Sequence, residues 1–411
     1  MKLKKILVAI ISVILALALF AGCAKPTTMA TVTDLDGNPV GTVSFDEYLF
    51  WAYYNYAYYQ AYYESYYYYF QKYFHETLDD IFDPEAEEKI TVNEYLTDSL
   101  VKDLKQQFVI LKLFDEYGLT FGTDEITNVG LYYNSMISNY GEAKVKKIRA
   151  RLGMNETQFK EMLRSLVKIS SVQEHLFGDD GIRKVTDQQV KDYFLENYIR
   201  VKHVYIGSTY TVKENDKDVK KTRTEAEMQA LVDQILAEYN ANPTIDNFLK
   251  LVEKYSEDTG STKTKTENNV TSPDLDYCQA SYDSSAGAIT VTEYGGYTFI
   301  KDYASFNEPF VNLAGELETG KAGSCKVTSV DTEGNTTVTG MHVILKTDLN
   351  TSEAAIKSAT ELTDNYGESY LKSIVESDIF MALMDEEIAK LNFTFDEELL
   401  KKYSMKNLKK I

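Results

Sequence analysis

The stretch V-T-G-M-H-V-I-L-K, from Val338 to Lys346, has the pattern of a buried β-strand that carries one histidine. A similar run, V-K-H-V-Y-I, begins at Val201 and also has a histidine near its centre. The whole chain contains only four histidines. We therefore expect the two strands to lie side by side in one small sheet, which would bring His203 and His342 together.

The composition is that of a globular protein of more than one domain. The chain has 411 residues, of which 44% are hydrophobic and 26% are charged, and this length favours two to three domains. The formal net charge is −20. Because phosphate binding requires a basic face, this charge argues against a nucleic-acid-binding protein.

The N-terminus has the features of an export signal. Three lysines precede the apolar stretch from Ile6 to Phe20, which is then followed by F-A-G-C ending at Cys23. Small residues before this cysteine resemble a bacterial lipobox, which implies removal of residues 1–22 and lipidation of Cys23. Residues 23–29 would then form a tether at the extracytoplasmic face of the cell membrane. An uncleaved anchor or an ordinary secretory signal remains open.

Two further cysteines, Cys278 and Cys325, lie in the remainder of the chain. Outside the membrane they could form a disulfide or remain free thiols, and the sequence does not decide between these states. Their spacing forms no Cys-x-x-Cys or mixed Cys/His cluster, so we predict no metal site and no cofactor.

A tyrosine-rich segment follows a predicted hairpin at residues 30–43. Ser44 and Glu47 predict a capping box that begins a helix, which we expect to continue to Phe74. Thirteen of the 32 tyrosines lie between Tyr48 and Tyr73. Such a helix would either pack among several partners or present aromatic rings to unfolded polypeptide, and both interpretations remain open.

The rest of the chain changes from helical to mixed and back to helical. Residues 199–348 carry strand signals, while Gly260 to Gly287 is polar and is expected to be a surface loop. The predicted helices cover residues 92–117, 123–140, 142–152, 155–177, 185–198, 225–239, 244–255, 351–391 and 396–403. We therefore expect an α+β fold, in which a 199–348 domain is inserted into a mostly helical lobe formed by residues 30–198 and 349–411.

The 199–348 segment resembles the parvulin family of peptidyl-prolyl cis/trans isomerases. Six short matches occur in the family's order along the chain. They are R-V-K-H-V from Arg200, F-L-K-L-V-E-K-Y-S-E-D ending at Asp258, Gly295-Gly296, F-N-E-P-F from Phe306, the segment from Leu317 to Ser324, and T-G-M-H-V-I from Thr339. The resemblance implies a small antiparallel sheet with flanking helices.

The resemblance also implies roles for individual residues. His203, His342, Asp258 and Thr339 would form the catalytic group. Phe306, Phe310, Met341 and Thr298 would bind the substrate. The family's pocket leucine corresponds here to Thr298, and an aromatic residue of the family corresponds to Gly315, so the proline pocket is expected to be altered on two sides.

The layout as a whole resembles extracytoplasmic foldases of the PrsA/SurA kind, although the flanking regions match only in their order. Such a protein would act on unfolded or newly secreted polypeptides containing X-Pro bonds, without a phosphate requirement. Three functions remain open from the sequence: an active isomerase, a non-catalytic chaperone with a degenerate parvulin module, and a surface lipoprotein that binds a partner through its tyrosines.

Overall fold

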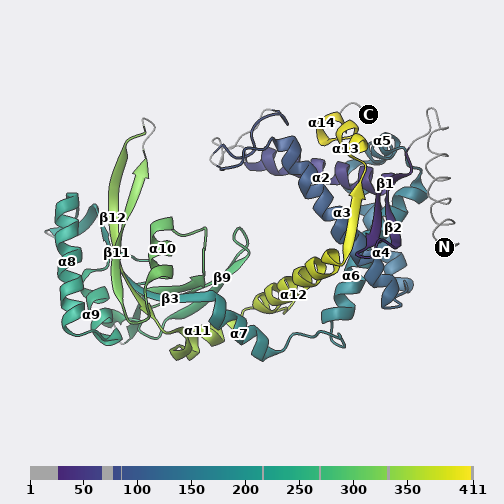
Figure 1. Ribbon diagram of the computed structural model, residues 1–411. Coiled ribbons are helices and arrows are strands. Elements are labelled where there is room, and N and C mark those ends of the chain that lie inside the picture. The colour runs from purple at the N-terminus through teal and green to yellow at the C-terminus, as the bar shows by residue number, and fades with distance from the viewer. Residues whose placement is uncertain are drawn as a thin grey trace. The chain divides into compact units, whose positions relative to one another are not determined.

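The computed structural model describes residues 26–66, 77–84, 86–214, 217–267, 270–330 and 334–408. The chain divides into two compact units (Figure 1). Unit 1 comprises Met1–Arg183 and Phe380–Ile411, and unit 2 comprises Lys184–Ile379. The predicted Cys23 and residues 67–74 of the predicted tyrosine-rich helix lie outside the described residues.

Unit 1 is a bundle of helices beside a three-stranded sheet. The expected hairpin forms, since β1 and β2 pair antiparallel, and β13 pairs with the other edge of β1. The capping box at the start of α2 also forms, with Ser44 and Glu47 each bonding the other's backbone N–H. The elements are β1 (Thr28–Asp34), β2 (Pro39–Ser44), α2 (Phe45–Tyr66), α3 (Val92–Glu116), α4 (Thr123–Tyr140), α5 (Glu142–Leu152), α6 (Glu156–Phe177), β13 (Leu391–Phe395), α13 (Glu397–Lys402) and α14 (Met405–Leu408).

The first turns of α2 are anchored in the core of unit 1. Tyr48 is 1% exposed, and its hydroxyl donates a hydrogen bond to the backbone oxygen of Tyr403 at 2.8 Å. Tyr54, in contrast, is exposed. The described part of the tyrosine-rich helix thus uses some rings for packing and presents others to solvent.

Unit 2 is built on a six-stranded antiparallel sheet with the order β11-β12-β3-β10-β9-β8. Two small hairpins, β4–β5 and β6–β7, extend from it. The elements are α7 (Asp187–Asn197), β3 (Tyr198–Gly207), β4 (Thr209–Glu214), β5 (Lys217–Thr222), α8 (Glu225–Ala241), α9 (Ile245–Tyr255), β6 (Thr264–Glu267), β7 (Val270–Pro273), β8 (Cys278–Asp283), β9 (Ala288–Glu293), β10 (Gly296–Ile300), α10 (Glu308–Glu316), β11 (Ala322–Val330), β12 (Thr336–Thr347), η2 (Leu349–Thr351) and α11 (Glu353–Thr360), with α12 (Tyr370–Ala389) continuing into unit 1.

The two faces of this sheet have different coverings because successive strand residues point to opposite sides. Val204, Val343 and Leu345 point to one face and join a core with α8 and α9. Val201, Phe299 and Ile344 point to the other face and pack against α10. The polar positions that concern function lie on the α10 face.

The α+β fold class is confirmed, and several details differ from the expectations. Residues 260–287 are not a plain surface loop, because β8 pairs with β9 as an edge strand and β6–β7 forms a hairpin. Residues 349–379 group with unit 2, where α11 packs against β8, β9 and α7. The observed boundaries therefore differ from the expected range of 199–348. Cys278 and Cys325 are free thiols on the two opposite edge strands of the sheet.

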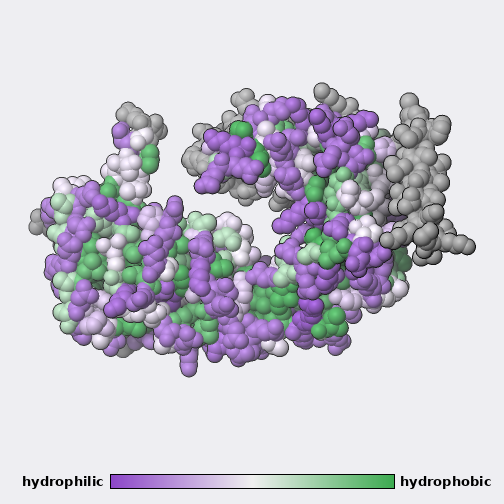
Figure 2. Space-filling view, viewed as in Figure 1, coloured by the Kyte–Doolittle hydropathy of each residue, from purple (hydrophilic) through white to green (hydrophobic). Residues whose placement is uncertain are grey.

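The surface carries both hydrophilic and apolar residues. Figure 2 shows the two kinds interspersed over the viewed face of each unit, with hydrophilic residues prevailing. Within the described part of the chain, none of the helices combines the length and apolar character needed to cross a membrane.

Candidate functional site

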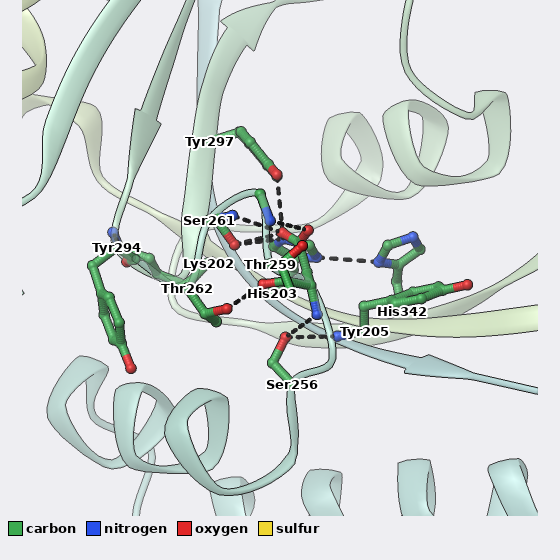
Figure 3. Close-up of polar contacts among 12 residues, drawn as sticks. Lys202, His203, Tyr205, Ser256, Thr259, Ser261, Thr262, Tyr294, Tyr297 and His342 are labelled. Carbon is green, nitrogen blue, oxygen red and sulfur yellow. Dashed lines mark hydrogen bonds and ion pairs between the residues drawn. The ribbon is translucent and has the colours of Figure 1, made fainter. Parts of the chain in front are cut away.

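The pairing of β3 with β12 brings two histidines together. His203 lies opposite Ile344, and Tyr205 lies opposite His342, so the two histidines are diagonal neighbours on one face of the sheet. Their Nδ1 atoms are 3.1 Å apart, which is a hydrogen-bond distance. Figure 3 shows this contact between the two rings.

Asp258, in the connection after α9, accepts several hydrogen bonds at a single carboxylate oxygen. Its Oδ2 lies 3.0 Å from His203 Nε2, 2.6 Å from Ser261 Oγ and 2.9 Å from the hydroxyl of Tyr297. The Ser261 backbone N–H donates to the same oxygen, while Oδ1 accepts from the Gly260 backbone N–H. Figure 3 shows Ser261 and Tyr297 beside His203 in this network of hydrogen bonds.

These hydrogen bonds fix the protonation of the network. Burial raises the pKa of Asp258, but the hydrogen bond and charge of His203, with the hydrogen bond of Ser261, outweigh burial and hold that pKa well below its usual range. The carboxylate is therefore charged and can only accept, so His203 Nε2 must carry a proton. Burial, and secondarily the charge of His203, lowers the pKa of His342 to about 3, so that His342 is neutral near pH 7.

The direction of the bond between the histidines depends on the charge of His203. When His203 is neutral, its Nδ1 has a lone pair, so His342 Nδ1–H donates to it and His342 Nε2 becomes an acceptor. When His203 is protonated, its Nδ1–H donates instead, and the proton of neutral His342 moves to Nε2. The pair can therefore present either an acceptor or a donor at His342 Nε2.

An aromatic wall surrounds the histidines. Phe310 on α10 contacts both rings edge to face, with ring centroids 5.5 Å from His203 and 4.9 Å from His342. Phe306 packs against Tyr297 at 5.2 Å and against Phe310 at 5.8 Å. Together these groups enclose a pocket of about 380 Å³, lined by His203, Tyr205, Asp258, Tyr297, Ser305, Phe306, Asn307, Phe310, Val327 and His342.

Five of the eight residues predicted for the pocket lie in it. His203, His342 and Asp258 form the polar floor, and Phe306 and Phe310 form part of the wall. These placements match the sequence positions, while the roles of the five side chains in chemistry remain predictions.

The other three predicted residues do not line this pocket. Met341 is 1% exposed and belongs to the core on the opposite face of the sheet, because it is adjacent to His342 in a strand. Thr298 is fully buried and also points to the opposite face, because its neighbour Tyr297 on the same strand points into the pocket. Thr339 donates its hydroxyl hydrogen bond to the Val327 backbone oxygen. The predictions that Met341 and Thr298 contact substrate are therefore wrong for this pocket, and Thr339 is not among the lining residues.

The sequence analysis assigned no role to five residues that line the pocket, which are Tyr205, Tyr297, Ser305, Asn307 and Val327, or to Ser261, which bonds Asp258. Strand alternation predicts the positions of Tyr205 and Tyr297. Tyr205 is two residues from His203 on β3, and Tyr297 is two residues from Phe299 on β10, so each shares the face of its neighbour. Strand alternation does not predict the position of Ser261. Its hydroxyl is brought to the site by a turn in which the Ser261 backbone N–H bonds the Asp258 carboxylate. Across the described ranges of the chain, no group of three or more His, Cys, Asp and Glu side chains could hold a metal ion.

Comparisons with known proteins find similarity only among solved structures. No family model and no curated protein matches the chain. The similar structures include PrsA from Bacillus subtilis, with a TM-score of 0.21 and 16% identity over 80% of this chain and 94% of that chain. They also include foldase protein PrsA from Streptococcus pneumoniae str. Canada MDR_19A, with a TM-score of 0.22 and 13% identity over 79% of this chain and 99% of that chain. These scores are too low for either structure to assign a family or a site.

Proposed function

We propose that the pocket on the α10 face catalyses cis/trans isomerisation of X-Pro bonds in unfolded or newly secreted polypeptides. The observation that carries this proposal is the pair of hydrogen-bonded histidines at the floor of a pocket walled by Phe306 and Phe310.

The chemistry requires no nucleophile and no cofactor. The X-Pro amide isomerises over a barrier of roughly 18–20 kcal/mol, and its transition state is a twisted amide that has lost conjugation. A site that binds the twisted form more tightly than either planar form accelerates the reaction. Phe306 and Phe310 would hold the proline ring away from water, which disfavours the polar, conjugated amide.

The histidines would bind the peptide group as it twists. His342 Nε2 can accept a hydrogen bond in one charge state of His203 and donate one in the other. Asp258 would act as a positioning residue, because its carboxylate fixes the proton of His203 on Nε2. Thr339 would support the sheet beside the site through its bond to the β11 backbone rather than contact the substrate.

A proline-isomerisation assay on a short X-Pro peptide tests the proposal. We expect turnover by the parent protein and a loss of at least about tenfold in kcat/KM in His203→Ala and in His342→Ala, which corresponds to about 1.4 kcal/mol of transition-state binding. His175→Ala is the matched control, because this histidine lies on α6 of unit 1 against Tyr117 and should leave turnover unchanged. Absence of turnover in the parent would reject catalysis.

A binding function without turnover is the second candidate. Tyr297 favours it, since its ring takes the pocket side of β10 and its hydroxyl is already bonded to Asp258. A binding module would retain affinity for X-Pro peptides and suppression of aggregation while the assay shows no turnover. Suppression of aggregation that survives loss of the 199–348 module would place chaperone activity in the helical lobe.

The sequence also supports a proposal about location. We propose that cleavage before Cys23 and lipidation of its thiol anchor the protein at the extracytoplasmic face of the bacterial membrane. Cys23→Ala should then release the protein from the membrane fraction and abolish labelling by a fatty-acid analogue. Equal membrane association of the variant and the parent would contradict this proposal.

A further inference from the structure

One segment that lies outside the strands of the main sheet supplies much of the aromatic wall. Residues 301–307 connect β10 to α10, and Ser305, Phe306 and Asn307 of this connection line the pocket. Asp302 has a φ of 62°, a left-handed conformation that non-glycine residues rarely adopt. A connection with such a backbone persists only where its surroundings hold it in place.

The surroundings that hold it come from the hairpin of β8 and β9. Asp283, the last residue of β8, accepts a hydrogen bond at Oδ2 from the hydroxyl of Tyr303 and another from that of Ser305, each at 2.6 Å. Both donors lie within the connection, on either side of Ala304. A single carboxylate oxygen therefore holds the side chains of Tyr303 and Ser305, which precede Phe306 in the chain.

The other oxygen of this carboxylate secures Asp283 itself. Its Oδ1 accepts from the backbone N–H and hydroxyl of Ser285, at 2.9 and 2.6 Å, and so closes the turn between β8 and β9. The strands of this hairpin pair from Cys278 to Asp283. The carboxylate is thus held by the turn at the edge of the sheet, and it can serve as an anchor for the 301–307 connection.

The contact reaches the pocket through aromatic packing. Tyr303, which is 5% exposed, packs edge to face against Phe306 with ring centroids 4.8 Å apart. The Phe306 backbone N–H also points at the Tyr303 backbone oxygen, at 3.4 Å. Hydrogen bonds from Ser285, Ser305 and Tyr303 hold the pKa of Asp283 well below its usual range, so the carboxylate is charged near pH 7.

We propose that Asp283 is a positioning residue that fixes the 301–307 connection, and with it Phe306, against the pocket. This inference rests on the proposed function in so far as Phe306 binds the substrate proline there. It also gives a role to the polar stretch before Gly287, which would serve as a support for the pocket wall. Loss of the contact should loosen the wall while the two histidines and Asp258 keep their arrangement.

The test uses Asp283→Asn in the full chain. Asparagine keeps an oxygen for the Ser285 turn and replaces the charged oxygen that accepts from Tyr303 and Ser305 by a neutral NH₂ group, with almost no change of volume. Any bond that this NH₂ group donates to the two hydroxyls lacks the charge that strengthens the bonds of the parent. Asp276→Asn is the matched control. Asp276 lies in the same stretch, and its side chain is 91% exposed beside Lys265.

Two readouts separate this inference from the proposed function. Amide hydrogen exchange within residues 301–307 should accelerate at least about tenfold in Asp283→Asn, while the amides of β3 and β12 exchange as in the parent. KM for the X-Pro peptide should rise about fivefold or more with kcat within about twofold, because uniform binding is lost and the catalytic group is not. The control should change neither quantity.

Unchanged exchange in Asp283→Asn would overturn the positioning role whether or not the parent turns over substrate. A parent without turnover would reject the proposed function and leave the exchange result to decide the role of Asp283. Tyr303→Phe gives an independent check, because it removes one of the two donors. Its effect on exchange should not add to that of Asp283→Asn in the double variant, and full additivity would contradict a shared contact.

Discussion

Acidification should destabilise the protein through one buried imidazole. The pKa of His342 is about 3 in the folded protein, chiefly because of burial and secondarily because of the charge of His203. In the unfolded chain a histidine titrates near its reference pKa of about 6.5. Between these two values the unfolded chain binds a proton that the folded protein does not, so the free energy of unfolding must fall as the pH falls.

The size of this effect follows from the shift. One pKa unit corresponds to about 1.4 kcal/mol, and at pH 4 the unfolded chain has passed its own pKa by about 2.5 units. The stability from neutral His342 is therefore almost complete at pH 7, and about 3 kcal/mol of it is lost at pH 4. Below the folded pKa near 3 the loss reaches its limit, because both states are then protonated.

Urea unfolding at pH 7, 6, 5 and 4 measures this loss, with His342→Gln as the reference. Glutamine does not titrate, so subtracting its pH dependence removes the contributions of the carboxylates that both proteins share. Trp51, the single tryptophan, lies on α2 of unit 1, so its fluorescence reports on the unfolding of that unit. A loss of ellipticity without a change in this fluorescence therefore reports on the unfolding of unit 2. Equal pH dependence of parent and variant, or an NMR titration of His342 centred near pH 6.5, would refute the reasoning.

Other positions give predictions that do not depend on catalysis. Glu293→Ala should lower the free energy of unfolding by about 3–5 kcal/mol in urea titrations, because it leaves two cations without their carboxylate. These are Arg200, held by bonds of 2.7 and 2.8 Å, and the buried Lys202 at 3.9 Å. A cost under 1 kcal/mol would contradict the ion-pair explanation. Phe248→Ala should cost about 3–5 kcal/mol in the same measurement, because its ring is fully buried, and a cost under 1 kcal/mol would contradict the packing. Gly340→Ala should displace the Tyr205 ring, which lies 2.5 Å from where the new Cβ would stand, and an unshifted Tyr205 NMR signal would show that the site has more space.

Much of the helical structure was predictable because its signals are local. The capping boxes at Thr91, Thr186 and Thr224 each join residues three apart, and all three mark observed helix starts. The pairing of the two histidine strands was predictable for a different reason, since each strand is a buried run with one polar side chain at its centre. The antiparallel pairing of β3 and β12 confirms that expectation.

The errors arise where structure depends on distant partners. The sequence predicts the end of a helical tail where β13 lies. The segment forms a strand instead, because it pairs with the free edge of β1. β8 reads as a polar loop and is ordered by pairing with β9. Met341 was placed in the pocket although strand alternation separates it from its neighbour His342. The role of Asp283 had no sequence signal, since its donors lie in another connection.

The way the chain divides has a consequence for how it is made. Residues 184–379 form one continuous stretch, whereas unit 1 needs both ends of the chain, because β1 pairs with β13 about 360 residues later. During synthesis from the N-terminus, the inserted unit can finish folding before residue 391 has emerged. Until then one edge of β1 has no strand to pair with, and it is exposed to other nascent chains. The pairing of β13 with β1 is thus a late step in the folding of unit 1.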